Sequence, residues 1–377
     1  MSKMFNCLEP ELHNIVLDKN DTWYRIIKHC LNVRIPGKNP IDLNDYVKDQ
    51  PKNEWEIMDR DGIRIHENEA FVRRAIERPI ERLEHPNDIY IYNEKTTDMA
   101  SQFMYGTLTT TSDTDNTEFL TNDWEYNFIP KVQCSWRDII HDYKELIPPS
   151  NAIIIIDRYL FNPNKKHNID YKNGIRNVYG ILNELLPKQF KGEFHIMIVF
   201  KNGEIGTNIK LIDFVSDLEK IRKRLTNDFG YHIILEVLTL KEKLNQTYED
   251  SHDRHIFSNY YAIRASHGFS AIRPREDMKN SIFYIDKGYP VWAQTIVYKG
   301  IYCGIQKRIM KKSSLPVLMN DYILSSLKSY VNELKSSNSK DGYIYVCFGN
   351  KNLSLAKEED LKKHSIRQIR NRLLLDQ

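Results

Sequence analysis

The most informative part of this chain is Ser251-His252-Asp253-Arg254-His255-Ile256-Phe257-Ser258-Asn259, which continues to Gly268-Phe269-Ser270. It places a histidine and an arginine two residues apart, then an asparagine, then a Gly-Phe-Ser string. Side chains two residues apart on a β-strand point to the same side of the sheet. A strand at this position can therefore present the imidazole of His252 and the positive charge of Arg254 to one phosphate.

The residues before this motif alternate between predicted strands and predicted helices. The expected strands are 152–156, 194–200 and 232–240, the expected helices are 174–186 and 209–229, and shorter strands are expected at 255–258 and 261–265. Alternating strands and helices are typical of a parallel sheet whose faces are covered by the connecting helices. The sequence therefore predicts an α/β fold with a mixed, mainly parallel sheet and flanking helices.

Three regions are expected along the 377 residues. Residues 1–147 are interpreted as an α+β domain of unassigned role, with helices at 23–31 and 67–83 and a strand at 89–92. Pro148-Pro149-Ser150 marks the start of the α/β domain, which is expected to span 148–298. Residues 299–377 are expected to form a basic extension packing on it, with helices at 318–334 and 358–375 and a strand at 343–348.

The motif and the order of elements resemble a half-domain of the phospholipase D superfamily, whose pattern is H-x-K-x4-D followed by G-S. In this chain Arg254 stands in the place of the lysine and Asn259 in the place of the aspartate. The His-Asp-Arg variant is similar to the phospholipase D-like domain at the C-terminus of microtubule-interacting and transport proteins, which is regarded as a binding module. The resemblance covers about a third of the chain, residues 152–272.

The resemblance implies a role for each matching residue. His252 corresponds to the catalytic nucleophile, and Arg254, Asn259 and Ser270 correspond to phosphate-binding positions. Covalent catalysis on a phosphodiester needs a second histidine to protonate the leaving oxygen. The chain has one copy of the motif, so an active site would require a symmetric dimer with two His252 side chains facing each other.

The motif is compatible with three functions. The leading expectation is a protein that binds a phosphate of nucleic acid or of another phosphorylated ligand without chemistry. The first alternative is a dimeric, metal-independent phosphodiesterase or nuclease that uses His252. The second alternative is a structural subunit that docks a protein partner, which an Arg254 buried in an ion pair would favour.

The C-terminal region offers a second, weaker candidate for nucleic-acid binding. Residues 299–377 hold 15 Lys and Arg against 7 Asp and Glu, whereas the rest of the chain holds 39 against 44. A basic surface can follow a nucleic-acid backbone independently of base sequence, although a solvated helix face explains the same charges. The candidate residues are Lys307, Arg308, Lys311, Lys312, Arg367 and Arg370.

No metal or cofactor is expected. The five cysteines are widely separated and form no C-x-x-C pair, so a cysteine-rich zinc site and a disulfide framework lack support. The fingerprints of NTP-binding, dinucleotide-binding and zinc-peptidase sites are absent. Asp157, which follows the strand at 152–156, is interpreted as a cap of the next turn or a partner of Arg158 rather than as a metal ligand.

A cytoplasmic protein is expected from the sequence. The chain begins without an apolar signal segment and contains no run of about 20 apolar residues. High Lys, Asn, Ile and Tyr usage is typical of an AT-rich bacterial genome. A subunit of a multi-component complex, acting in defence against phage, is a further expectation by association with proteins of this kind.

Overall fold

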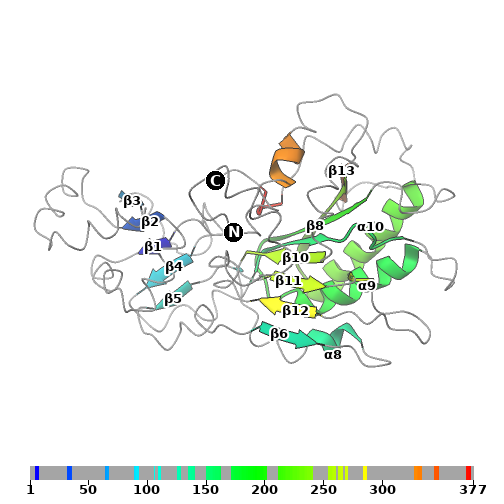
Figure 1. Cartoon of the computed structure of the whole chain (residues 1–377), viewed down its shortest axis with the longest axis horizontal. Helices are drawn as coiled ribbons and strands as arrows, with labels where there is room; N and C mark the ends of the chain where they lie inside the picture. Colours follow the sequence, from blue (N-terminus) through cyan, green and yellow to red (C-terminus); the bar gives the residue numbers. More distant parts are fainter. Residues whose placement is uncertain are drawn as a thin grey trace, which may run out of the picture.

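The computed structural model describes residues 5–7, 32–35, 64–67, 89–92, 106, 109–111, 125–128, 135–140, 150–162, 171–201, 211–240, 254–259, 262–265, 268–270, 283–286, 327–332, 344–347 and 371–374. The described strands form two sheets, one of five strands and one of eight (Figure 1).

The five-stranded sheet belongs to the N-terminal region. Its strands are β1 (Phe5–Cys7), β2 (Asn32–Ile35), β3 (Arg64–Glu67), β4 (Ile89–Tyr92) and β5 (Thr109–Thr111), in the order β3-β2-β1-β4-β5. Every neighbouring pair is parallel, and the strand expected at 89–92 is confirmed. The α+β class expected for residues 1–147 stays a prediction, because the helices expected there fall outside the described residues.

The other four strands of this sheet are not predicted from the sequence, because each is only three or four residues long. Strands of three or four residues are too short to establish an alternation of apolar and polar residues. The helix expected at 23–31 lies outside the described residues. So does the helix expected at 67–83, except for Glu67, which is the last residue of β3.

The eight-stranded sheet contains residues Arg254–Ser258 of the motif, which form one of its strands. Its strands are β6 (Glu125–Phe128), β7 (Ala152–Ile156), β8 (Glu193–Lys201), β9 (His232–Leu240), β10 (Arg254–Ser258), β11 (Ala262–Ala265), β12 (Phe283–Asp286) and β13 (Ile344–Cys347). Their order is β13-β9-β8-β7-β10-β11-β12-β6. Strands β7, β8 and β9 are parallel, and β10 is antiparallel to β7. These four strands confirm the predicted mixed, mainly parallel sheet.

The sheet draws strands from all three expected regions. Strand β6 precedes Pro148 and pairs with β12, whereas β13 comes from the C-terminal extension and pairs with β9. The short helix α8 (Trp136–Ile140) also precedes Pro148, and its apolar side chains join the same core.

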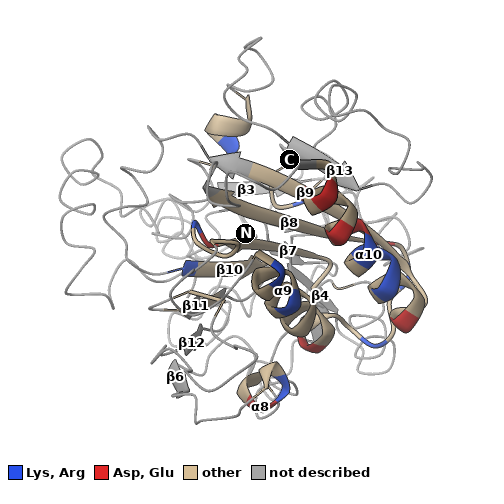
Figure 2. Ribbon diagram, turned by 90° about the vertical axis from the view of Figure 1, so that its right-hand side faces the viewer, with Lys and Arg blue, Asp and Glu red and all other residues tan. Residues whose placement is uncertain are grey.

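One face of the sheet is covered by two long helices, α9 (Tyr171–Leu185) and α10 (Leu211–Phe229) (Figure 2). Each helix presents an apolar stripe at a spacing of three and four residues, as expected of a helix that packs on a sheet. The core cluster joins these stripes to one set of alternate strand residues; it includes Ile153, Ile155, Ile196, Ile198, Val178, Ile181, Leu218 and Leu225.

Helix α9 begins three residues before the expected start and runs through two glycines. A Cβ on Gly174 would meet the backbone carbonyl of Leu160, and a Cβ on Gly180 would lie 2.6 Å from the ring of Trp136. The glycines therefore bring the turn after β7 and helix α8 into direct contact with α9.

The other face of the sheet is also buried. Ile154, Met197 and Ile234, which alternate with the core residues named above, have no exposed surface. Residues 371–374 reach this sheet, because Asn371 donates a backbone hydrogen bond to Glu236 Oε2 (2.9 Å) and a side-chain hydrogen bond to the carbonyl of Ile153 (3.2 Å).

The C-terminal predictions have mixed outcomes. Residues 327–332 are helical, within the expected helix at 318–334, and β13 lies within the expected strand at 343–348. Residues 371–374 form a turn rather than the end of the helix expected at 358–375.

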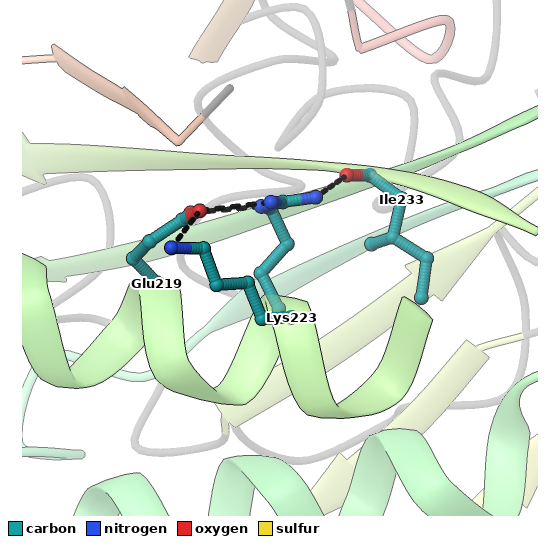
Figure 3. A network of polar contacts seen from close by, with 4 residues as sticks. Glu219, Lys223 and Ile233 are labelled. Carbon is teal, nitrogen blue, oxygen red and sulfur yellow. Dashed lines mark hydrogen bonds and ion pairs between the residues drawn. The ribbon is translucent and has the colours of Figure 1, made fainter. Parts of the chain in front are cut away.

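A buried ion pair joins α10 to β9 (Figure 3). Arg222 donates through Nε and Nη2 to the two carboxylate oxygens of Glu219, each at 2.8 Å, and through Nη1 to the carbonyl of Ile233 at 3.3 Å. The described residues of β13 pair with β9 from Leu235 onwards. Arg222 therefore bonds to β9 two residues before that described pairing begins.

None of the helices in the described part of the chain is long and apolar enough to cross a membrane.

Candidate functional site

Asp157 lies at the carboxyl end of β7 and ties together three parts of the chain. Its side chain is 1% exposed. Oδ1 accepts a hydrogen bond from the backbone N–H of Tyr159 (2.9 Å), and Oδ2 accepts one from the backbone N–H of Phe269 (2.7 Å). The expected cap of the following turn is therefore confirmed, and Asp157 also forms an ion pair with Arg254.

Gly268 allows the motif to approach Asp157. Its φ is +100°, a conformation that side chains disfavour. A Cβ at this position would lie 2.7 Å from Oδ2 of Asp157. The glycine of the Gly-Phe-Ser string is therefore needed both for its backbone conformation and for the close contact beside Phe269.

Arg254 is the first residue of β10 and lies beside Asp157. The antiparallel register pairs His255 with Ile156, which brings the preceding residue of β10 next to the residue that follows β7. Arg254 Nε lies 3.7 Å from Asp157 Oδ1, and the side chain is 14% exposed. Such a separation is an ion pair but not a hydrogen bond.

Within the described part of the chain, the guanidinium of Arg254 has N–H donors without an acceptor. Its Nε is buried without a hydrogen-bond partner, and no hydrogen bond from its other nitrogens is found within the described part of the chain. Arginine carries five N–H donors in a fixed fork, which suits carboxylate and phosphate oxygens. Both oxygens of Asp157 already accept backbone hydrogen bonds. An acceptor from a ligand would therefore pair with the remaining N–H donors of Arg254.

An exposed aromatic ring stands beside the guanidinium. Tyr159 is 38% exposed. The Cζ atom of Arg254 lies 5.3 Å from the centre of the Tyr159 ring, and the Cζ atom of Arg158 lies 4.9 Å from it. These distances are within the range of cation–π contacts. Two guanidinium groups therefore gather around one ring at the carboxyl edge of the sheet.

Ser270 lies against the first turn of α9. Asn173 Nδ2 donates to Ser270 Oγ at 3.0 Å, so the hydroxyl proton of Ser270 can be donated elsewhere. Asn173 is 1% exposed, and its Oδ1 has no hydrogen-bond partner among the described residues. The turn after β7, the Gly-Phe-Ser loop and the N-terminus of α9 thus meet at one edge of the sheet.

The structure does not place Asn259 with Arg254. Strand β10 separates the two residues, and at about 3.3 Å per residue they lie about 16 Å apart. Asn259 is buried, its Oδ1 accepts from the backbone N–H groups of Asn151 (3.0 Å) and Ala152 (3.1 Å), and its Nδ2 donates to Asn151 Oδ1 (3.0 Å). This asparagine anchors the start of β7, and we leave it out of the candidate site.

The other candidate residues lie outside the described residues. These are His252, Lys307, Arg308, Lys311, Lys312, Arg367 and Arg370. Of the other basic residues in 299–377, Lys328 and Arg372 are described. Burial lowers the pKa of Arg372, and the nearby charge of Glu193 opposes this effect.

The described residues offer no metal centre. They contain no group of three or more His, Cys, Asp and Glu side chains that could hold an ion. His255 is buried and stacks on Phe257 at 5.2 Å between ring centres. Because it follows Arg254 directly on the strand, its side chain points to the opposite side of the sheet.

The sequence motif indicates Arg254 and Ser270 but gives no signal for Tyr159 and Asn173, which lie beside them. The sequence indicates a structural role for Asp157, without its contacts to Arg254 and Phe269. The signal that would have found Tyr159 is its position in the turn directly after a buried strand, where open α/β sheets place ligand contacts.

Comparisons of this chain with protein-family models, with curated proteins and with solved structures found no match.

Proposed function

We propose that this chain binds a phosphate group at the carboxyl edge of its eight-stranded sheet, through Arg254 and without catalysing a reaction. The observation that carries the proposal is the guanidinium of Arg254. It is held beside Asp157 while none of its donors has a hydrogen-bond acceptor in the described part of the chain. Charge-assisted hydrogen bonds from arginine to phosphate are among the stronger polar contacts in proteins.

The surroundings of Arg254 support an anionic ligand. Asp157 fixes the position of the arginine before a ligand arrives, which reduces the entropy lost on binding. The N-terminus of α9 lies at the same edge, as the contact between Asn173 and Ser270 requires. Helix N-termini favour negative charge through their exposed N–H groups and their dipole. The hydroxyl of Ser270 supplies a further donor.

The resemblance to phospholipase D-like domains points to the same ligand. It makes Arg254 a phosphate-binding position and predicts that His252 faces the same phosphate. Asn259 does not contribute to this site, and a single motif lacks the second histidine that covalent catalysis requires. Binding without chemistry is therefore the function that we propose.

Replacing Arg254 tests the proposal. We expect Arg254→Ala to weaken the binding of a fluorescent single-stranded oligonucleotide of about 12 nucleotides by roughly ten-fold or more, the worth of a hydrogen bond to a charged group. Fluorescence anisotropy measures this change. Unchanged affinity would overturn the proposal.

Arg224→Ala is a matched control for that measurement. Arg224 Nε lies 3.7 Å from Asp228 Oδ2, the same separation as between Arg254 and Asp157, but on the exposed surface of α10. Both variants remove one positive charge from an ion pair. We expect Arg224→Ala to bind like the wild type, so equal losses would indicate an effect of net charge alone.

A second candidate function is a subunit that docks a protein partner. The near-complete burial of Arg254 beside Asp157 favours it, because a buried pair can be structural. In that case Arg254→Ala would lower the free energy of unfolding, and neither the wild type nor the variant would bind a phosphate ligand.

A hydrolysis assay on the same oligonucleotide, with EDTA and with His252→Ala, tests the enzyme alternative. Cleavage that persists in EDTA and disappears in His252→Ala would overturn the non-catalytic proposal.

A further inference from the structure

Tyr159 is held on a rigid turn with its ring facing outward. The next two residues, Leu160 and Phe161, are buried in the core. Asp157 fixes the start of the turn by accepting hydrogen bonds from Tyr159 N through its side chain and from Leu160 N through its carbonyl (3.2 Å). The exposed ring is therefore presented by a well-packed turn rather than by a free loop.

The position of this ring beside Arg254 bears on the kind of phosphate ligand. A free phosphate ion uses the guanidinium but gains nothing from an aromatic surface. A nucleotide offers both groups, because its phosphate suits arginine and its base has a face that stacks on aromatic rings. The two guanidinium groups near Tyr159 are placed to add cation–π contacts to the same base, as arginines do in proteins that bind single strands.

We infer that the ligand at Arg254 is a nucleotide with an unpaired base, and that Tyr159 contacts the face of that base. The inference rests on the proposed phosphate site and adds the chemical class of its ligand. In a duplex each base is stacked between its neighbours, so a base face reaches Tyr159 only from a single strand or a free nucleotide. Since stacking is open to every base, the site is expected to show little sequence preference.

Oligonucleotides with and without bases test the inference. We compare a single-stranded oligonucleotide with one of the same length in which the central nucleotides are abasic, so that the number of phosphates is the same. The wild type is expected to bind the intact strand roughly ten-fold more tightly. Tyr159→Leu is expected to lose this preference and Tyr159→Phe to keep it, because phenylalanine retains the ring.

A second tyrosine provides the matched control. Tyr179 on α9 also has an arginine over its ring, with Arg224 Cζ 4.3 Å from the ring centre, but its hydroxyl bonds to Asp228 near the C-terminus of α10. Tyr179→Leu therefore removes a tyrosine–arginine contact away from the candidate site. We expect this variant to prefer the intact strand as strongly as the wild type.

The outcomes separate the inference from the function on which it rests. Equal binding of both strands, with affinity still dependent on Arg254, overturns the nucleotide inference and leaves the phosphate site standing. Binding of neither strand overturns both the nucleotide inference and the phosphate site.

If the wild type prefers the intact strand, a competition experiment identifies the source of the ligand. Displacement by a mononucleotide at similar concentration indicates small nucleotides, and failure to displace indicates a single strand.

Discussion

At the scale of single residues, Asp157 organises the candidate site. Its two oxygens accept hydrogen bonds from the turn after β7 and from the Gly-Phe-Ser loop, and its charge lies beside Arg254. A carboxylate that accepts two backbone hydrogen bonds while balancing a nearby cation is well compensated for its burial. The site therefore depends on how closely Phe269 approaches Asp157.

The close approach at Gly268 can be tested by adding a methyl group. We expect Gly268→Ala to lower the free energy of unfolding by about 3 kcal/mol, because its positive φ and its contact with Asp157 both penalise a Cβ. Gly230→Ala is the control, since Gly230 also has a positive φ of +76° but nothing within 4 Å of the added Cβ. Gly230→Ala is expected to lower the free energy of unfolding by about 1 kcal/mol. Chemical denaturation measures the stability of both variants, and equal losses would refute the role given to the contact between Gly268 and Asp157.

At the scale of elements, the buried pair on α10 fixes how this helix packs on β9. Glu219 and Arg222 side chains are 5% and 3% exposed. Removing Glu219 takes away the opposite charge that lies against the buried Arg222, which is much more destabilising than losing a surface pair. The pair therefore matters for the register of α10 against the sheet rather than for ligand binding.

Two substitutions on α10 test this assignment. Glu219→Ala is expected to lower the free energy of unfolding by about 3–5 kcal/mol. Lys223→Ala removes the other cation near Glu219, at 3.9 Å, but Lys223 is largely exposed. We expect Lys223→Ala to lower the free energy of unfolding by less than about 1 kcal/mol. Urea denaturation measures the stability of both variants, and similar values would contradict the structural role given to the buried pair.

The start of β9 should respond to high pH. Burial raises the pKa of Tyr231, whose hydroxyl donates to the carbonyl of Pro187 at 2.9 Å. Because the folded pKa lies above the ordinary value of 10.0, the unfolded chain loses its proton first. The stabilisation from Tyr231 is complete below pH 10.0 and declines as the pH rises above it.

Tyr231→Phe separates this effect from other titrations. It is expected to lower stability by about 1 kcal/mol at neutral pH, where the hydrogen bond is lost. As the pH rises above 10.0, the wild type should lose more stability than the variant, so their difference narrows. Denaturation at a series of alkaline pH values measures this difference, and a constant difference would argue against a buried, protonated tyrosine.

At the scale of the whole molecule, the sequence predicted the α/β core better than the site or the N-terminal sheet. Strands β7 and β9 match their expected bounds, because long apolar runs carry a strong signal. The site depends on contacts across the fold, such as Asp157 with Phe269, which no local pattern reveals. Asn259 matched a motif position, yet the extended strand β10 carries it to the opposite edge of the sheet.

We propose that Arg254 binds a phosphate at the carboxyl edge of β7, and a crystal structure of the chain with a bound single-stranded trinucleotide tests this. We expect a phosphate oxygen about 2.7–2.9 Å from a guanidinium nitrogen of Arg254, with Asp157 still bonded to Phe269. A trinucleotide bound elsewhere, with Arg254 making no contact to it, would contradict the claim.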